Sequence, residues 1–227
     1  MKIHLLAAVA AGVLAAGAAN ATTTISYVGY GTALSAGETL VTDFSNPSAL
    51  PTGFTLGGTA AFLTGTSGVG AAPATSATTR DLGQYLSVER NQYETLATPL
   101  IHEVSLYIGS VDWYNTVTFR FTDGSTQAYT GTQLAALVPS PANGDQQSKQ
   151  TNGRYTFKFD APINQVRLDS RGNSFEVADV AAVSPSGVPE PATWTMMLVG
   201  FGLLGVVLRA GVLQNRRLAR LQGSATN

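Results

Sequence analysis

Hydrophobic and polar residues alternate along the middle of the chain with the period of a β-strand. The stretch Thr116–Thr122 places three apolar side chains on one face and Thr and Arg side chains on the other. A period of two predicts a half-buried strand. Asp123-Gly124 follows directly, and Ser125–Thr130 is a second strand candidate. This order, strand, Asp-Gly, strand, predicts a β-hairpin.

The same pattern recurs in short segments bounded by turn residues. Further strands are predicted at Ile25–Tyr30, Thr39–Phe44, Phe54–Leu56, Ala60–Leu63, Tyr85–Glu89, Ile101–Ile108, Arg154–Asp160, Val166–Leu168 and Phe175–Val183. About ten short strands predict an all-β fold, an antiparallel β-sandwich of jelly-roll type. Thr130–Leu137 is the exception, because a Thr cap precedes a helical pattern of one or two turns. Gly65–Thr79 and Pro139–Gly153 are predicted loops.

The N-terminus has the three parts of a secretory signal peptide. Lys2 and His4 make a short basic start, an Ala-rich apolar run follows, and Ala19-Asn20-Ala21 has small residues at both ends. These parts predict export by the Sec translocon and cleavage by signal peptidase after Ala21. A short membrane anchor is the alternative, but Ala and Gly make the run only weakly apolar.

The C-terminus carries a longer apolar run. Trp194–Leu208 contains 15 residues without an ionisable side chain, and the run reaches 20 residues at Leu213 if Arg209 extends to the interface. A span needs about 17–25 residues, so 194–213 is predicted to be a transmembrane helix. The alternative is a buried core helix. An interfacial Trp on one side and Arg209, Arg216, Arg217 and Arg220 on the other favour the span.

Charge is distributed unevenly between the two sides of this run. Between Thr22 and Thr193 there are 8 Lys and Arg and 14 Asp and Glu residues, whereas 4 Arg and no acid follow Leu208. The positive-inside rule therefore places the tail, 214–227, in the cytoplasm and the body, 22–184, outside. A mildly acidic body without a basic patch argues against nucleic acid as a partner.

The body is expected to fold without covalent help. The chain has no Cys, so no disulfide holds a domain whose compartment would permit one. About 160 residues suffice to bury a hydrophobic core.

Between body and span lies the segment 185–193, which contains Pro189-Glu190-Pro191. Trp194, Met196-Met197-Leu198 and Gly200-Phe201-Gly202 follow in order. These residues resemble the PEP-CTERM sorting signal, in its PEPxxWA-type variant from exopolysaccharide-producing Gram-negative bacteria. The same tail is also known as an ice-binding-protein C-terminal domain. Two prolines keep the motif extended, because Pro fixes φ and disfavours a helix at the residue before it.

The resemblance implies a route to the surface. An exosortase would read the PEP motif, the helix would hold the protein in the inner membrane, and the Arg cluster would stop transfer. Thr195 departs from the usual Ala, and Ala210–Asn215 splits the basic cluster. The body also looks, more loosely, like the ectodomains that precede such tails, which carry no assigned activity.

Catalytic chemistry has little support in the body. His102 is its one histidine, no G-x-S-x-G elbow is present, and no second His completes a zinc motif. A glycoside hydrolase would need a carboxylate pair, and Asp43, Glu89, Glu94, Glu103 and Glu176 are candidates. Solvated surface charges explain most of these acids. Thr residues do not recur at the fixed step that an ice-binding surface needs.

Two binding hypotheses remain. Trp113 and Tyr114 are adjacent aromatics in a turn, and an exposed pair there would stack on sugars. The preferred interpretation is that one of them plugs the end of the core. Glu38, Asp43, Glu176 and Asp179 would hold a structural Ca²⁺ if the first and last strands brought them together. No Ca²⁺-loop motif is present, and no other cofactor is expected.

We therefore expect a non-enzymatic, exported protein of the cell surface or of the extracellular polysaccharide matrix of a biofilm, with a structural or adhesive role. A lectin-like carbohydrate-binding module is the alternative, and a secreted glycoside hydrolase is the third hypothesis.

Overall fold

The computed structural model of the chain describes residues 21–81, 83–138 and 140–183. These residues form an all-β body, as predicted at that level, in which ten strands join in one sheet. All of the strand pairs are antiparallel. Among the described residues the one helix is α1 (Gly131–Ala135).

The sheet and a separate small hairpin account for all the strands described. The sheet contains β1 (Thr23–Gly29), β2 (Thr39–Thr42), β3 (Thr55–Leu56), β4 (Ala61–Thr64), β7 (Gln84–Val88), β8 (Tyr93–Gly109), β9 (Asn115–Phe121), β10 (Thr126–Thr130), β11 (Gly153–Ser170) and β12 (Phe175–Ala182). The hairpin contains β5 (Thr66–Ser67) and β6 (Gly70–Ala71). It lies within Gly65–Thr79, which the sequence predicted as a loop.

Two long strands, β8 and β11, run through the middle of the sheet. The sequence predicted Arg154–Asp160 and Val166–Leu168 as separate strands, but both belong to β11. The pairing of β11 with β8 shifts register between Lys158 and Ile163, around Pro162. Proline has no N–H to donate to a ladder and is tolerated at a bulge, so the strand bends there and continues. β8 likewise begins at Tyr93, earlier than predicted.

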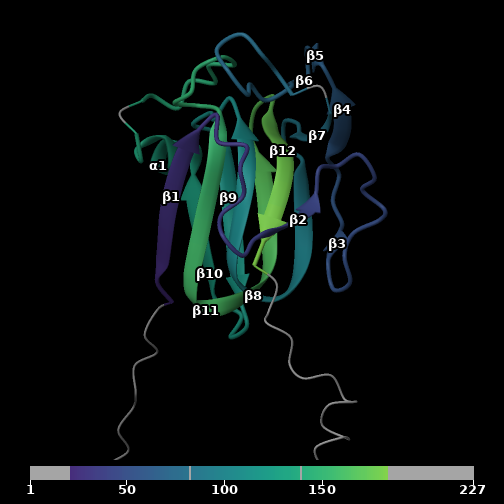
Figure 1. Cartoon of the computed structure of the whole chain (residues 1–227), viewed down its shortest axis with the longest axis vertical. Helices are drawn as coiled ribbons and strands as arrows, with labels where there is room; N and C mark the ends of the chain where they lie inside the picture. The colour runs from purple at the N-terminus through teal and green to yellow at the C-terminus, as the bar shows by residue number, and fades with distance from the viewer. Residues whose placement is uncertain (1–20, 82, 139, 184–227) are drawn as a thin grey trace, which may run out of the picture. The chain divides into compact units, whose positions relative to one another are not determined.

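The bends divide the sheet into two layers. The first layer contains β1, residues 153–159 of β11, residues 103–109 of β8, and β12 with β2, β7 and β4. The second layer contains β10, β9, residues 163–170 of β11, residues 93–101 of β8, and β3. Figure 1 shows strands of the body in front of and behind one another.

The hydrophobic core lies between the two layers. Phe119 on β9 of the second layer is fully buried, and its ring centroid lies 4.6 Å from that of Phe157 and 4.8 Å from that of Phe159, both in β11 of the first layer. These three residues are among the alternating apolar positions of the sequence. Aromatic pairs at such distances contribute about 0.5–1.5 kcal/mol beyond their buried area.

Two local predictions are confirmed. β9 and β10 pair as a hairpin across Asp123-Gly124, and Gly124 has the positive φ of 87° that favours glycine in such turns. Thr130 caps α1: its hydroxyl accepts from the Gln133 backbone, and the Gln133 side chain accepts from the Thr130 backbone. This reciprocal capping box satisfies donors that a short helix would otherwise leave open.

The first and the last strand of the body connect to the rest of the chain at the same end. Thr22 precedes β1 and binds Asp160, and Val183 follows β12 and donates to the carbonyl of Glu103. Asp160 and Glu103 both flank the bends, whereas α1 lies at the opposite end (Figure 1). No helix among the described residues is long and apolar enough to cross a membrane. The predicted span 194–213 lies outside the described residues.

Candidate functional site

A polar groove opens at the end of the second layer that is far from Thr22 and Val183. Its volume is about 420 Å³. Three segments line it, namely the start of β8, the start of β9 and the end of β11. The lining residues are Asn91, Gln92, Tyr93, Tyr114, Thr116, Arg167, Asp169, Ser170 and Arg171.

Strand register brings these side chains together. In β11, Val166 and Leu168 are buried while Arg167 and Asp169 are half-buried, so the second pair points out of the sheet. Asp169 lies opposite Tyr93 of β8 and Thr116 of β9. The outward residues of three neighbouring strands therefore form one row.

Arg167 is held in place by two neighbours on this face. Its guanidinium carbon lies 4.1 Å from the centroid of the Tyr93 ring. Its Nε donates to the Asp169 carboxylate at 2.9 Å and 3.0 Å, and Nη2 donates at 2.7 Å. Stacking and a bidentate ion pair orient the guanidinium. Nη1 has no hydrogen-bond partner among the described residues, so it is free to bind a ligand.

The two aromatic residues singled out in the sequence lie beside the groove and behave differently. Trp113 is 66% exposed, so of the two residues it is not the one that fills the core. Tyr114 is half-buried and packs over Gly172, where an added Cβ would lie 2.8 Å from its ring. The two rings meet edge to face at 5.5 Å.

The hydroxyl of Tyr114 is fixed by its surroundings. It donates to Asp112 Oδ2 at 2.6 Å and lies 2.7 Å from the carbonyl oxygen of Asn173. Burial, followed by the hydrogen bond to Asp112, raises the pKa of Tyr114 well above its usual value. Burial also raises the pKa of Asp112, against the opposing hydrogen bond. Tyr114 therefore remains a neutral phenol at ordinary pH.

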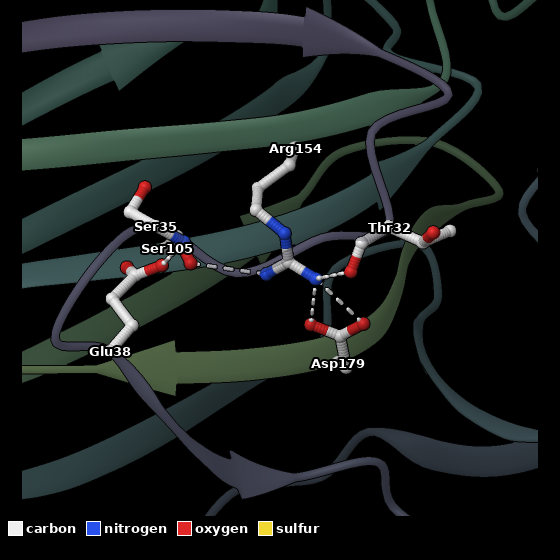
Figure 2. Close-up of polar contacts among 6 residues, drawn as sticks. All are labelled: Thr32, Ser35, Glu38, Ser105, Arg154 and Asp179. Atoms are coloured by element: carbon white, nitrogen blue, oxygen red, sulfur yellow. Dashed lines mark hydrogen bonds and ion pairs between the residues drawn. The ribbon is translucent and has the colours of Figure 1, made fainter.

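The four carboxylates of the calcium hypothesis do not come together. Asp179 pairs instead with Arg154, whose Nη2 donates to its two oxygens at 2.7 and 3.0 Å (Figure 2). The side chains of this pair are 3% exposed for Arg154 and 21% for Asp179. Arg154 also donates to Ser105 Oγ at 3.0 Å and to the Thr32 carbonyl at 3.4 Å. These contacts link β11 to β8, to β12 and to the loop that contains Thr32, on the outer face of the first layer.

The other three carboxylates each have separate partners. Glu38 accepts from the Ser35 backbone at 2.8 Å (Figure 2), and Asp43 accepts from the Ser45 backbone at 3.0 Å. Glu176 is buried and accepts from three donors, which are Ser174 Oγ at 2.5 Å, Ser110 Oγ at 2.8 Å and the Ala71 backbone at 3.1 Å. Across residues 21–81, 83–138 and 140–183, no three His, Cys, Asp or Glu residues are grouped to hold a metal.

Two further catalytic candidates, His102 and Glu103, also lie apart from the groove. His102 is exposed on β8, and its Nδ1 lies 3.1 Å from the carbonyl oxygen of Phe159. Its neighbour Glu103 pairs with Lys158 at 3.0 Å. Both lie near the bends, at the end of the body away from the groove. His102 therefore has no part in the groove.

Sequence reasoning found Tyr114 but missed Tyr93, Arg167 and Asp169. One signal was present: the Arg-x-Asp pair alternates with two apolar residues, which places both charges on the outward face of a strand. The partner Tyr93 comes from a part of β8 that was not predicted as a strand. Only the register of β8 against β11 reveals it.

The sorting motif lies beyond the described residues. Pro189, Glu190, Pro191 and Trp194 lie there, as do the signal-peptide residue Ala19 and the stop-transfer residues Arg209, Arg216, Arg217 and Arg220. The predicted cleavage-site residue Ala21 is the first residue described.

One of three comparisons with known proteins identifies the tail, and the other two say little about the body. Residues 187–211 match the family model of the PEP-CTERM protein-sorting motif. No protein with a curated description matches the chain. A solved peptidoglycan O-acetylesterase shares 15% identity at a TM-score of 0.34 over 62% of this chain, which spans only 32% of the esterase.

A second solved structure is the family 32 carbohydrate-binding module of C. perfringens NanJ in complex with galactose. It shares 12% identity at a TM-score of 0.33, over 64% of this chain and 98% of the module. Likenesses this weak carry no argument about the fold or the ligand of this chain. The motif match is the informative result.

Proposed function

Since the chain is a protein with a PEP-CTERM sorting motif, we propose that it is an exosortase substrate with a structural or adhesive role at the cell surface or in the extracellular polysaccharide matrix. The match over residues 187–211 carries this proposal. The Sec translocon and signal peptidase export the body, and 194–213 holds it in the inner membrane as a single span. The exosortase then acts near Pro189-Glu190-Pro191.

The body is suited to such a role. Its two layers bury an aromatic core without disulfides, and we propose that they form a sandwich of jelly-roll type. The chain leaves the body at Val183, at the end opposite the groove.

The test of sorting compares the wild-type chain with a variant in which Pro189, Glu190 and Pro191 are all replaced by Ala. Intact mass and cellular fraction are measured in the host. We expect loss of the helix and release from the inner membrane only when the motif is intact. If both forms keep the helix and stay in the inner membrane, the protein is an ordinary single-span anchor and the proposal fails.

Carbohydrate binding is the second candidate function, and the groove favours it. An exposed indole beside a groove lined by amides, hydroxyls and an Arg–Asp pair offers one face for a sugar ring and several groups for its hydroxyls. The test measures binding to a panel of glycans by the wild type and by Trp113→Ala. Leu100→Ala is the matched control, since Leu100 is 53% exposed near the bends. Equal loss in both variants would contradict this assignment.

We propose that the body is not an enzyme. Hydrolysis of a glycoside needs two carboxyl groups about 5–9.5 Å apart across the bond. Among the residues that line the groove, Asp169 is the one carboxylate, and Arg167 already binds it. Turnover of a polysaccharide by the purified chain, abolished by Asp169→Asn, would overturn this proposal.

A further inference from the structure

The outer face of the second layer is an open, polar surface that continues from the groove. Alternation in β8, β9, β10 and β11 points one set of side chains away from the core. The strand registers arrange them in three rows, which are Tyr93, Asp169, Thr116 and Thr130; Thr95, Arg167, Thr118 and Ala128; and Ala97, Gln165, Arg120 and Thr126. Neighbouring strands lie about 4.8 Å apart, so each row presents a side chain at that interval.

Half of the Lys and Arg residues of the body lie on this face or at the mouth of the groove. Arg90, Arg120, Arg167 and Arg171 are four of the eight Lys and Arg residues between Thr22 and Thr193. Arg120 lies one row from Arg167, on the neighbouring strand. Arg171 lines the groove, and Arg90 precedes Asn91 at its edge. These four arginines therefore lie near one another in a body that is acidic overall, because its Asp and Glu residues outnumber its Lys and Arg residues.

Three of these four arginines form no ion pair with a carboxylate in the part of the chain that the structure describes. The ion pairs among the described residues join Arg154 with Asp179, Lys158 with Glu103 and Arg167 with Asp169. Arg90, Arg120 and Arg171 are all exposed and make none of these pairs. A guanidinium binds a carboxylate through two parallel hydrogen bonds, so such residues suit a ligand that brings its own carboxylates.

The same region also offers groups that suit sugar rings. Trp113 is exposed beside the groove, and Asn91 and Gln92 at its edge can both donate and accept hydrogen bonds. A ligand that uses all these groups has an apolar ring face, hydroxyls and repeated negative charges. These are the properties of an acidic polysaccharide built from uronic acids.

We propose that this face binds an acidic polysaccharide, with uronate carboxylates at Arg120 and Arg171 and a sugar ring on Trp113. The inference rests on the carbohydrate-binding function proposed above and adds the class of glycan. Arg167 is pre-oriented by Tyr93 and Asp169, so its free Nη1 contacts the glycan with little loss of side-chain entropy. Single-stranded nucleic acid is a polyanion as well, so the experiment includes it as a competing ligand.

The experiment is a calorimetric titration of the full chain in detergent with two matched ligands. One is a hexamer of galacturonic acid, and the other is the same hexamer with its carboxyl groups reduced to primary alcohols. We expect the acidic hexamer to bind about tenfold or more tightly than the reduced one, because hydrogen bonds between charged groups are the stronger class. Added salt should reduce this preference by screening.

Three variants locate the site. Arg120→Gln and Arg171→Gln should each weaken binding of the acidic hexamer about tenfold and binding of the reduced hexamer by a clearly smaller factor, because the charged contact is lost only with the acidic ligand. Lys149→Gln is the control, because Lys149 is exposed and lines a separate groove with Tyr27 and Gln150. It removes one positive charge elsewhere and should change nothing.

Each other outcome overturns a defined part of the argument. Equal binding of both hexamers would overturn the acidic class and leave carbohydrate binding intact. Binding of neither hexamer, together with a blank glycan panel, would overturn both. Equal affinity for single-stranded DNA would show unspecific attraction of polyanions and would also overturn the proposal, as would a loss in Lys149→Gln that matches the loss in Arg171→Gln.

Discussion

The buried ion pair between Arg154 and Asp179 allows a test of how burial changes the contribution of an ion pair to the free energy of unfolding. Asp179→Asn removes the negative charge but keeps the shape of the side chain. Arg154, only 3% exposed, would then retain Ser105 Oγ and the Thr32 carbonyl as acceptors and lose its ion-pair partner (Figure 2). Breaking a buried pair by removing one partner costs about 3–5 kcal/mol.

The lower end of that range applies here. Asp179 is 21% exposed, and two acceptors of Arg154 remain, so we expect Asp179→Asn to lower the free energy of unfolding by about 3 kcal/mol. For a body of this size about 1 kcal/mol corresponds to 2–4 °C, which predicts a fall in Tm of about 6–12 °C.

Asp169→Asn is the matched control, because it makes the same change in an ion pair of the same type. Its partner Arg167 is 41% exposed and Asp169 is 36% exposed. Exposed pairs contribute about 0–1 kcal/mol, so Tm should fall by no more than about 4 °C. The contrast between the two variants measures the effect of burial.

Urea unfolding followed by circular dichroism gives the free energies. The double variant Arg154→Met with Asp179→Leu completes the test, because a buried pair replaced by apolar residues is often neutral in stability. It should unfold at a higher urea concentration than Asp179→Asn alone. Equal losses in Asp179→Asn and Asp169→Asn would refute the reasoning.

Three further predictions concern a core residue, an exposed residue beside the groove and a buried carboxyl group. Phe119→Ala should lower the free energy of unfolding by about 3–5 kcal/mol in urea, because Phe119 is fully buried between the layers. Trp113→Ala, at an exposed position, should change it by less than about 0.5 kcal/mol, and a larger loss would show that the indole packs in the core. Burial raises the folded-state pKa of Glu176, so the folded body takes up a proton before the unfolded chain does. The free energy of unfolding should therefore rise as pH falls through that pKa toward the ordinary Glu value of about 4.3, and Glu176→Gln should flatten this rise in a series of melts.

Local pattern was enough to predict most strands of this fold. The hairpin at Asp123-Gly124 and the capped turn at Thr130 follow from residues that are neighbours in the chain. The continuity of β11 could not be predicted in this way, because Pro162 is an ordinary sign of a strand end. Pairing with β8 on one side, and with β1 and then β9 on the other, maintains the strand through the bend.

The candidate site was predicted only in part. Adjacent aromatics marked the turn at Trp113, but whether such residues fill the core or face solvent depends on what packs against them. Gly172 gives Tyr114 a surface to cover, and nothing comparable covers Trp113. The calcium hypothesis failed for a similar reason, since Asp179 is next to Arg154 in space and 25 residues from it in sequence.

The sequence by itself determined the sorting motif near the C-terminus and the all-β class of the body, and it predicted an export signal at the N-terminus. Signals for export and sorting are linear because the enzymes that read them bind short extended or helical segments. The groove, the row that joins Tyr93 to Asp169 and the arginine-rich outer face were decided by the tertiary structure alone. They depend on strand register, and register is set by the packing of one whole face against the core.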